Sequence, residues 1–293
     1  AEDYYMYPEN GKIHFACTDE RWKEGLKYLK KLCSDKLLSP ASFTTTPGQF
    51  NSIINKKEVI AGSFVSMGPN FTDENKNRSL EYKVIAPLIG PEGEQNPICW
   101  ATKPRNRFFI TKNCKYPEAA FRLGDIMCDE EVAIMNRWGV EGSDWERASE
   151  NDIGVASEEG YPALIVPKLG WGVRQNSHWH GNGPGYRDYN IGLGVAVTES
   201  NPMDYEIARS SLVYKNLMPK EYIVKLVYNI DEYDEVAKIS GEIMSYVNNS
   251  TVEFITGAKD IDANWDKFVS DLNLLGAERL KDIMQAAYSR TLK

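Results

Sequence analysis

The chain has 293 residues, a length typical of about two domains, of which 42% are hydrophobic and 26% charged, so general disorder is excluded. Its 34 basic and 42 acidic residues give a net charge of -8, and no basic run carries interleaved aromatics, which excludes nucleic acid as an expected partner. No apolar stretch approaches the roughly 18 residues needed to cross a bilayer.

Strands and helices alternate in the first ninety residues. Asn10 and Gly11 predict a tight turn before a strand at 12–16. Thr18 is the expected cap of a helix whose apolar stripe is formed by Trp22, Leu26, Leu29, Leu32 or Cys33, and Leu37. A short helix at 49–54 and strands at 59–65 and 82–87 follow. This alternation predicts an α/β layer.

The stretch from 108 to 147 joins a clear apolar segment to a clear helix start. Residues 108–110 predict a short strand, and Pro117 with Glu118 is typical of a first helical turn. One core-facing helix is predicted from the recurring apolar residues Ala120, Leu123, Ile126, Met127, Ala133, Ile134 and Trp138. Gly139 is expected to end it, before an ordered loop plugged by Trp145.

The second half of the chain is expected to be mostly helical. A proline-bounded edge strand is predicted at 161–167, followed at 170–189 by a loop rich in glycine, tryptophan, tyrosine and histidine. Helices are expected at 205–212, from Asp231 to a stop at Gly257, from Asp260 or Asp262 to Leu272, and at 280–288.

Neither a disulfide framework nor a zinc cluster is indicated by the cysteines. The five are widely spaced and form no C-x-x-C pair, so buried free thiols are favoured, with one bridge left open. His178 and His180 could supply two metal ligands, but a third is not evident, so no metal or other cofactor is predicted.

Several distinct motifs follow one another along the chain. ITK-x-C-K-x-PEAA from Ile110 is followed by RWGVEGSDWE, and ID-x-x-W-D-x-F-V from Ile261 stands near the end. Gly62-Ser63-Phe64 and the segment 84–93 precede them. Together these motifs resemble the extracellular solute-binding proteins of ABC importers, particularly the LplA-like lipoproteins associated with carbohydrate uptake.

The resemblance implies an α/β lobe of the type II periplasmic-binding-protein kind with additional C-terminal helices. We expect residues 1–150 to form the lobe, 151–200 an aromatic and glycine-rich loop region, and 201–293 a helical segment packing on the lobe. Members of this family are usually much longer. The chain is therefore expected to be a C-terminal portion, incomplete without a first lobe, a signal peptide and a lipid-bearing cysteine.

The function implied is non-covalent capture of a carbohydrate, with an oligosaccharide as the expected ligand, and its delivery to ABC permease subunits. The protein is expected to act as a monomer, outside the cell, on a lipid anchor. The resemblance predicts no enzymatic activity.

A sugar pocket combines flat apolar faces with a few placed polar groups. Phe64 is the strongest candidate, because related sugar binders often carry a stacking aromatic at this place. The predicted ligand-binding residues are Phe64, Trp100, Arg105, Trp171, Asn176, Trp179 and Tyr186. Four other tryptophans are assigned to core packing: Trp22, Trp138, Trp145 and Trp265.

Two alternatives remain open. A glycoside hydrolase would need two carboxylates about 5–9.5 Å apart, and no acidic pair stands in a recognisable catalytic context. A surface module for protein interaction would also explain the aromatics. Aromatics gathered in a concavity beside strand ends would favour ligand capture, whereas a flat patch would favour a protein partner.

Overall fold

The computed structural model describes residues 5–66, 71, 78, 81–96, 108–168, 192–198, 207, 212–223 and 226–291. The chain divides into two compact units. Unit 1 comprises Ala1–Gln49, Ile98–Lys103 and Pro219–Lys293, and unit 2 comprises Phe50–Pro97 and Pro104–Met218. The division expected at residues 150 and 200 stays a prediction. Packing instead groups the C-terminal helices with the first 49 residues.

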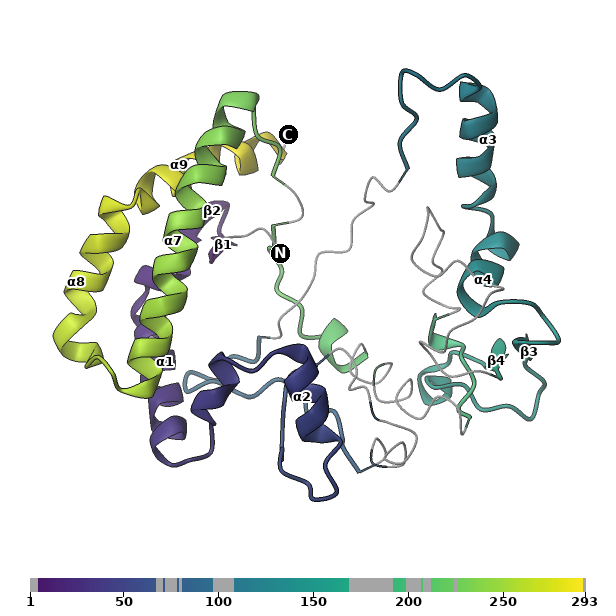
Figure 1. Cartoon of the computed structure of the whole chain (residues 1–293), viewed down its shortest axis with the longest axis horizontal. Coiled ribbons are helices and arrows are strands. Elements are labelled where there is room, and N and C mark those ends of the chain that lie inside the picture. The colour runs from purple at the N-terminus through teal and green to yellow at the C-terminus, as the bar shows by residue number, and fades with distance from the viewer. Residues whose placement is uncertain are drawn as a thin grey trace. The chain divides into compact units, whose positions relative to one another are not determined.

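Unit 1 is a helical bundle with a β-hairpin. Its helices are α1 (Glu20–Ser34), α7 (Ile230–Thr256), α8 (Ile261–Leu274) and α9 (Ala277–Thr291). The long helix α7 contacts each of the other three (Figure 1). The hairpin joins β1 (Met6–Glu9) to β2 (Lys12–Phe15), and β2 also contacts α9. Two single 3-10 turns lie at Ala16–Thr18 and Pro40–Phe43.

The ends of the helices in unit 1 follow capping rules. Asn229 begins α7 in a capping box with Glu232, two residues before the predicted cap. Gly257 ends that helix with φ of 78°, as predicted. Asp260 then caps α8 by accepting a hydrogen bond from the backbone N–H of Ala263 at 3.0 Å. Glycine at 276, with φ of 98°, separates α8 from α9.

The predicted cap of α1 is wrong by one residue. The side chain of Asp19 accepts from the N–H of Arg21, whereas Thr18 lies in the preceding 3-10 turn. Thr18 donates its hydroxyl to the carbonyl of Phe15 at 3.0 Å instead. The apolar stripe is confirmed for Leu26, which is buried, and for Trp22, Leu29 and Cys33, which pack partly buried against the core. It is wrong for Leu37, which lies beyond the end of α1 and is 75% exposed.

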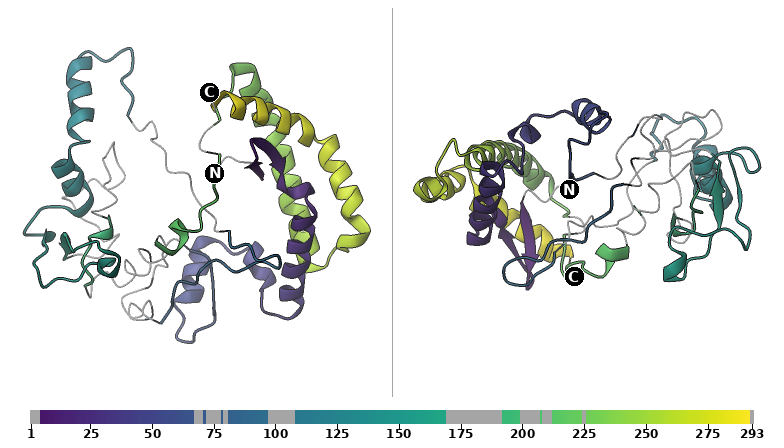
Figure 2. Two further views of the ribbon diagram at one scale, coloured as in Figure 1. Left: turned by 180° about the vertical axis from the view of Figure 1, so that it is seen from behind. Right: turned by 90° about the horizontal axis from the view of Figure 1, so that it is seen from below.

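The core of unit 1 forms where the hairpin, α1 and the three C-terminal helices meet (Figure 2). Met6, Ile13 and Phe15 contribute from the hairpin. The fully buried residues of the helices include Ile243, Val247, Phe254, Leu272, Leu280 and Met284. Segments more than 200 residues apart in sequence therefore share one core.

Unit 2 contains shorter elements. Its described helices include α3 (Pro117–Ile126) and α4 (Glu130–Trp138), and α2 (Pro47–Ile54) spans the boundary between the units in sequence. Strands β3 (Trp145–Arg147) and β4 (Ile165–Pro167) pair antiparallel, and a 3-10 turn lies at Ser157–Glu159. A small core includes Trp138, Trp145, Val155, Ile165, Leu193 and Val195.

The strand expected at 161–167 is thus confirmed only for its last three residues. Its expected edge position is wrong, because Ile165 pairs with Arg147 and also bridges to Val195. The strands predicted at 59–65, 82–87 and 108–110 are wrong, since no strand pairing is assigned to them. Apolar side chains in these segments are exposed, including Val65 at 94% and Phe109 at 74%. An extended segment becomes a β-strand only when a neighbour takes up its backbone hydrogen bonds.

The single helix predicted from 117 to 138 is divided into two. Asp129 begins α4 by accepting from the N–H groups of Glu131 and Val132. The core-facing assignment is right for Met127, Ala133 and Trp138, and wrong for two residues of α3, Leu123 and Ile126, which are 51% and 56% exposed. No element in the described part of unit 2 covers them.

Gly139 ends α4 with φ of 92°, as predicted. Trp145 is buried and donates its indole N–H to the carbonyl of Gly139 at 2.9 Å, so the predicted plug is confirmed. Most of the helix expected at 205–212 lies outside the described residues.

The described cysteines are all free thiols. Cys17 is buried, Cys33 and Cys114 are of intermediate exposure, and Cys128 is exposed, so burial was wrongly expected for the last; Cys99 lies outside the described residues. None of the helices within the described ranges is both long and apolar enough to cross a membrane.

Candidate ligand-binding site

Phe64 lies in an aromatic cluster of unit 2, which we call the Phe64 cluster: Phe50, Phe64, Phe71 and Tyr82. The ring of Phe64 meets Phe50 of α2 edge-on at 5.1 Å between centroids, and it meets Tyr82 at 5.1 Å with an interplanar angle of 60°. The ring of Phe71 stacks on the ring of Tyr82, with 6.0 Å between the centroids. These geometries are favourable for aromatic pairs.

Polar contacts fix the backbone around the Phe64 cluster. Tyr82 donates its hydroxyl to the carbonyl of Ala61 at 2.6 Å, which ties two extended segments together. Arg78 donates to the carbonyls of Ile54 at 2.8 Å and Lys57 at 3.0 Å, where α2 ends. Phe64 is only partly buried, so part of its ring remains accessible to a ligand.

The other six predicted ligand-binding residues lie outside the described residues: Trp100, Arg105, Trp171, Asn176, Trp179 and Tyr186. The same is true of the possible metal ligands His178 and His180. Among the residues that the structure does describe, no group of three metal-ligating side chains comes together.

The four tryptophans assigned to packing are in or against the cores. Trp138, Trp145 and Trp265 are buried, and Trp22 packs partly buried against the core of unit 1, with Tyr5 edge-on at 5.5 Å. These four tryptophans therefore have a packing role, as predicted, and are not candidates for sugar contacts.

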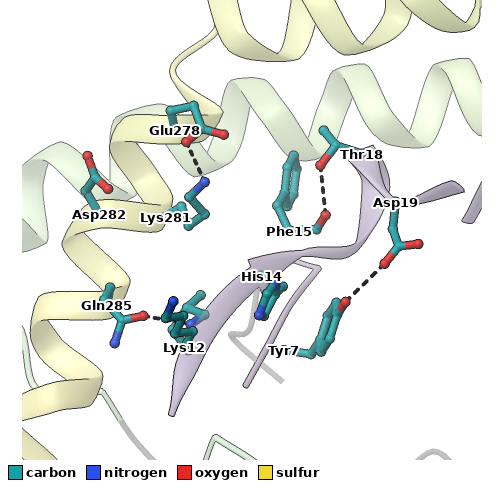
Figure 3. Close-up of a pocket in the computed structure, with 11 residues that line it drawn as sticks. Tyr7, Lys12, His14, Phe15, Thr18, Asp19, Glu278, Lys281, Asp282 and Gln285 are labelled. Carbon is teal, nitrogen blue, oxygen red and sulfur yellow. Dashed lines mark hydrogen bonds and ion pairs between the residues drawn. The ribbon is translucent and has the colours of Figure 1, made fainter. Parts of the chain in front are cut away.

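Unit 1 contains a cavity of about 620 Å³ between the hairpin and α9 (Figure 3). Gln285 of α9 is one of its lining residues, and its side-chain amide accepts from the N–H of Ile13 at 2.7 Å and donates to the carbonyl of Gly11 at 3.1 Å. The amide therefore pairs with the free edge of β2 as another peptide group would.

Charged and aromatic side chains line the rest of this cavity. Arg21 binds Asp19 at 2.7 Å, and this guanidinium holds the pKa of the Asp19 carboxyl at about 2. Burial, together with the hydrogen bond to Asp19, raises the pKa of Tyr7, whose ring stacks on His14 at 5.3 Å. On α9, Lys281 pairs with Glu278.

Most charged groups around the cavity are thus matched by neighbours from the same unit, which is typical of a structural network. No local pattern in the sequence predicts this network, because Ile13 and Gln285 are 272 positions apart. We retain the Phe64 cluster as the candidate ligand-binding site.

The sequence of the chain is similar to that of a known transport protein. No family model matches the chain. The fructooligosaccharide ABC transporter substrate-binding protein FusA of Streptococcus pneumoniae is 22% identical over 310 residues, covering 99% of this chain and 52% of FusA. The predicted resemblance to ABC-transporter solute-binding proteins is confirmed. The chain spans about half the length of this curated relative.

Solved structures show the same fold. S. pneumoniae FusA in complex with kestose has a TM-score of 0.67 at 18% identity, covering 99% of this chain and 58% of FusA. An HMO-binding, ABC-transporter-associated solute-binding protein from Bifidobacterium longum infantis has a TM-score of 0.68 at 15% identity, covering 97% of this chain and 56% of that one. The chain therefore has the solute-binding-protein fold, and these neighbours are binding proteins rather than enzymes.

Proposed function

We propose that the protein is the extracellular solute-binding component of an ABC importer and captures an oligosaccharide without changing it. The observation that carries this proposal is the similarity to a fructooligosaccharide-binding protein along 99% of the chain. A structure of that relative with kestose bound supports a sugar as the ligand class. The type II lobe architecture, the lipid anchor, the monomeric state and docking on permease subunits belong to the same proposal.

The Phe64 cluster supports the carbohydrate assignment on physical grounds. The C–H face of a sugar ring is apolar and packs on an aromatic ring that its neighbours hold rigidly. Phe50 and Tyr82 hold Phe64 from two sides, so little side-chain freedom is lost when a ligand binds.

Binding in such a protein works as a shift between open and closed states. The ligand stabilises the closed state only by the difference between its affinities for the two states. In this proposal the closed state is the one that the permease receives, so transport selectivity depends on contacts made on closure.

A thermal-shift screen of the complete gene product tests the proposal. Kestose and longer fructooligosaccharides should raise Tm, whereas single amino acids and short peptides should leave it unchanged. Phe64→Ala should reduce the sugar-induced shift, and Tyr233→Ala, which removes a 64% exposed ring from α7, should not.

Sugars that leave Tm unmoved alongside a peptide that raises it would end the carbohydrate assignment. Turnover of a bound oligosaccharide would favour the glycoside-hydrolase alternative, and a shift produced only by another protein would favour the interaction module.

A further inference from the structure

Arg78 ties the end of helix α2 to the part of the chain that precedes Tyr82. Its guanidinium donates to the carbonyl of Ile54 at 2.8 Å, to that of Lys57 at 3.0 Å and to that of Lys56. Ile54 is the last residue of α2 and is only 2% exposed, so the backbone that Arg78 binds is itself held by packing. The last carbonyls of a helix have no intrahelical partner and form its negative end, which a guanidinium matches well.

The two segments that Arg78 joins carry the two rings that hold Phe64. Phe50 lies one turn before Ile54, on the same face of α2. Tyr82 follows Arg78 by four residues. Both rings meet Phe64 at 5.1 Å between centroids. The guanidinium therefore limits how far these two rings can move apart.

The hydroxyl of Tyr82 completes the arrangement. It donates to the carbonyl of Ala61 at 2.6 Å, and Ala61 lies three residues before Phe64. Arg78 thus connects the segment of Tyr82 to that of Phe50, and Tyr82 connects its own segment to that of Phe64. The ring of Phe64 stays partly exposed within this frame.

The chemistry of arginine suits this position. Its donors are spread over a rigid, planar fork, so one side chain can bind three carbonyls at once, whereas lysine carries the same charge on a single nitrogen atom. Two of the three bonds of Arg78 are exposed, and such hydrogen bonds contribute only modestly to the stability of the fold. The main consequence of the three bonds is the placement of the two segments.

We propose that Arg78 is a positioning residue of the ligand-binding site, which sets the affinity for a sugar by holding Phe50 and Tyr82 against Phe64. This inference rests on the proposed function and deepens it. A ring that is fixed in advance loses little freedom when a sugar packs on it, and a loosely held ring loses complementarity. Removing the guanidinium should therefore weaken binding more than it destabilises the fold.

Isothermal titration calorimetry with kestose on the complete gene product tests this role. Arg78→Gln should weaken kestose binding by about tenfold or more, because the rings are no longer fixed in advance. Arg78→Lys, which keeps the charge, should weaken binding less. Tyr82→Phe keeps the ring, removes only the bond to Ala61 and should also weaken binding less than Arg78→Gln, so the test does not depend on one variant.

A matched arginine in unit 1 controls for general stability. Arg279 donates twice to Glu235, at 2.8 and 2.7 Å. Arg279→Gln should lower the Tm of the ligand-free protein by a few degrees, as Arg78→Gln should, but leave the affinity for kestose unchanged. Equal losses of affinity in the two variants would assign the effect of Arg78 to stability and overturn the proposal.

A double-mutant cycle with Phe64→Ala shows whether Arg78 acts through the ring. If it does, Arg78→Gln should cause no further loss of affinity once the ring of Phe64 has been removed. Additive losses would mean that Arg78 binds the sugar itself, and this result would overturn the positioning role.

The wild-type protein separates failure of this inference from failure of the proposed function. Wild type that binds kestose no more tightly than Arg78→Gln does would reject the inference alone. Wild type that binds neither kestose nor a longer fructooligosaccharide would reject the proposed function and, with it, the inference.

Discussion

Helices α9 and α3 have the same kind of apolar pattern and opposite environments. In α9, Ala277, Leu280, Ile283, Met284, Ala287 and Tyr288 are buried. In α3, Leu123 and Ile126 recur with helical spacing and remain exposed. The difference lies in their described partners, because α9 meets α7, α8 and β2, whereas the ring of Phe108 lies against α3 at Gly124.

The comparison shows that an amphipathic pattern predicts a helix and its inward face, but not whether the matching surface lies in the same polypeptide. Unit 1 contains both sides of its core. Among the residues that the structure describes, unit 2 has a small core around Trp138 and Trp145 and, outside it, segments with exposed apolar side chains.

The largest expected loss of stability comes from a substitution in α9, and the matched substitution in α3 should have little effect. Met284→Ala in α9 removes a fully buried side chain and should lower the free energy of unfolding of the 293-residue chain by about 2–5 kcal/mol. Leu123→Ala in α3 should change it by less than about 0.5 kcal/mol, because this residue is 51% exposed. Urea denaturation of both variants provides the measurement. Equal losses would show that α3 has a core within this chain.

A smaller effect is expected inside the core of unit 2. Trp145→Phe keeps an aromatic ring but leaves the carbonyl of Gly139 without the indole N–H that now lies 2.9 Å away. We expect a loss of about 1–3 kcal/mol in unfolding free energy, since a buried acceptor would lose its partner. Near-ultraviolet circular dichroism with urea reports the transition. An unchanged midpoint would mean that this core contributes little stability.

A substitution at Gly276 tests the turn between α8 and α9. Its φ of 98° is strained for any residue with a Cβ, and that Cβ would lie 3.3 Å from Cγ2 of Ile239 in α7. Gly276→Ala should therefore cost about 1–2 kcal/mol in urea denaturation. Gly241→Ala, where an added Cβ meets nothing within 4 Å, is the matched control and should be neutral or stabilising.

The smallest effect depends on pH. Because the pKa of Asp19 is lowered to about 2 by Arg21, this carboxylate stabilises the fold above its unfolded pKa near 3.9, and the contribution is lost as pH falls through 2. Asp19→Asn keeps a capping acceptor but not the charge. The gap in Tm between wild type and Asp19→Asn should be constant from pH 7 to 5 and narrow between pH 4 and 2. A constant gap at all pH values would contradict the ion pair.

Much of unit 1 was predictable from sequence because its signals are local. The turn at Asn10-Gly11, the stop at Gly257 and the stripe containing Leu26 each depend on residues within a few positions. Helix starts were displaced by one or two residues where two capping residues compete, as with Thr18 and Asp19. The pairing of Gln285 with β2 was not predictable, because nothing near either residue indicates the other.

The strands were less predictable for a physical reason. The segments 59–65 and 108–110 have the composition of buried strands, but strand formation requires hydrogen bonds from neighbours distant in sequence. For the ligand-binding site, the sequence directed attention to Phe64, and the structure adds its ring partners Phe50 and Tyr82. The remaining predicted contacts stay predictions.

Isothermal titration calorimetry with kestose, run in parallel on the 293-residue chain and on the complete gene product, tests the central claim most directly. The account predicts clear sugar binding by the complete product and weak or no binding by the 293-residue chain, which spans 52% of the curated relative. Sub-micromolar binding of kestose by the 293-residue chain alone would contradict it.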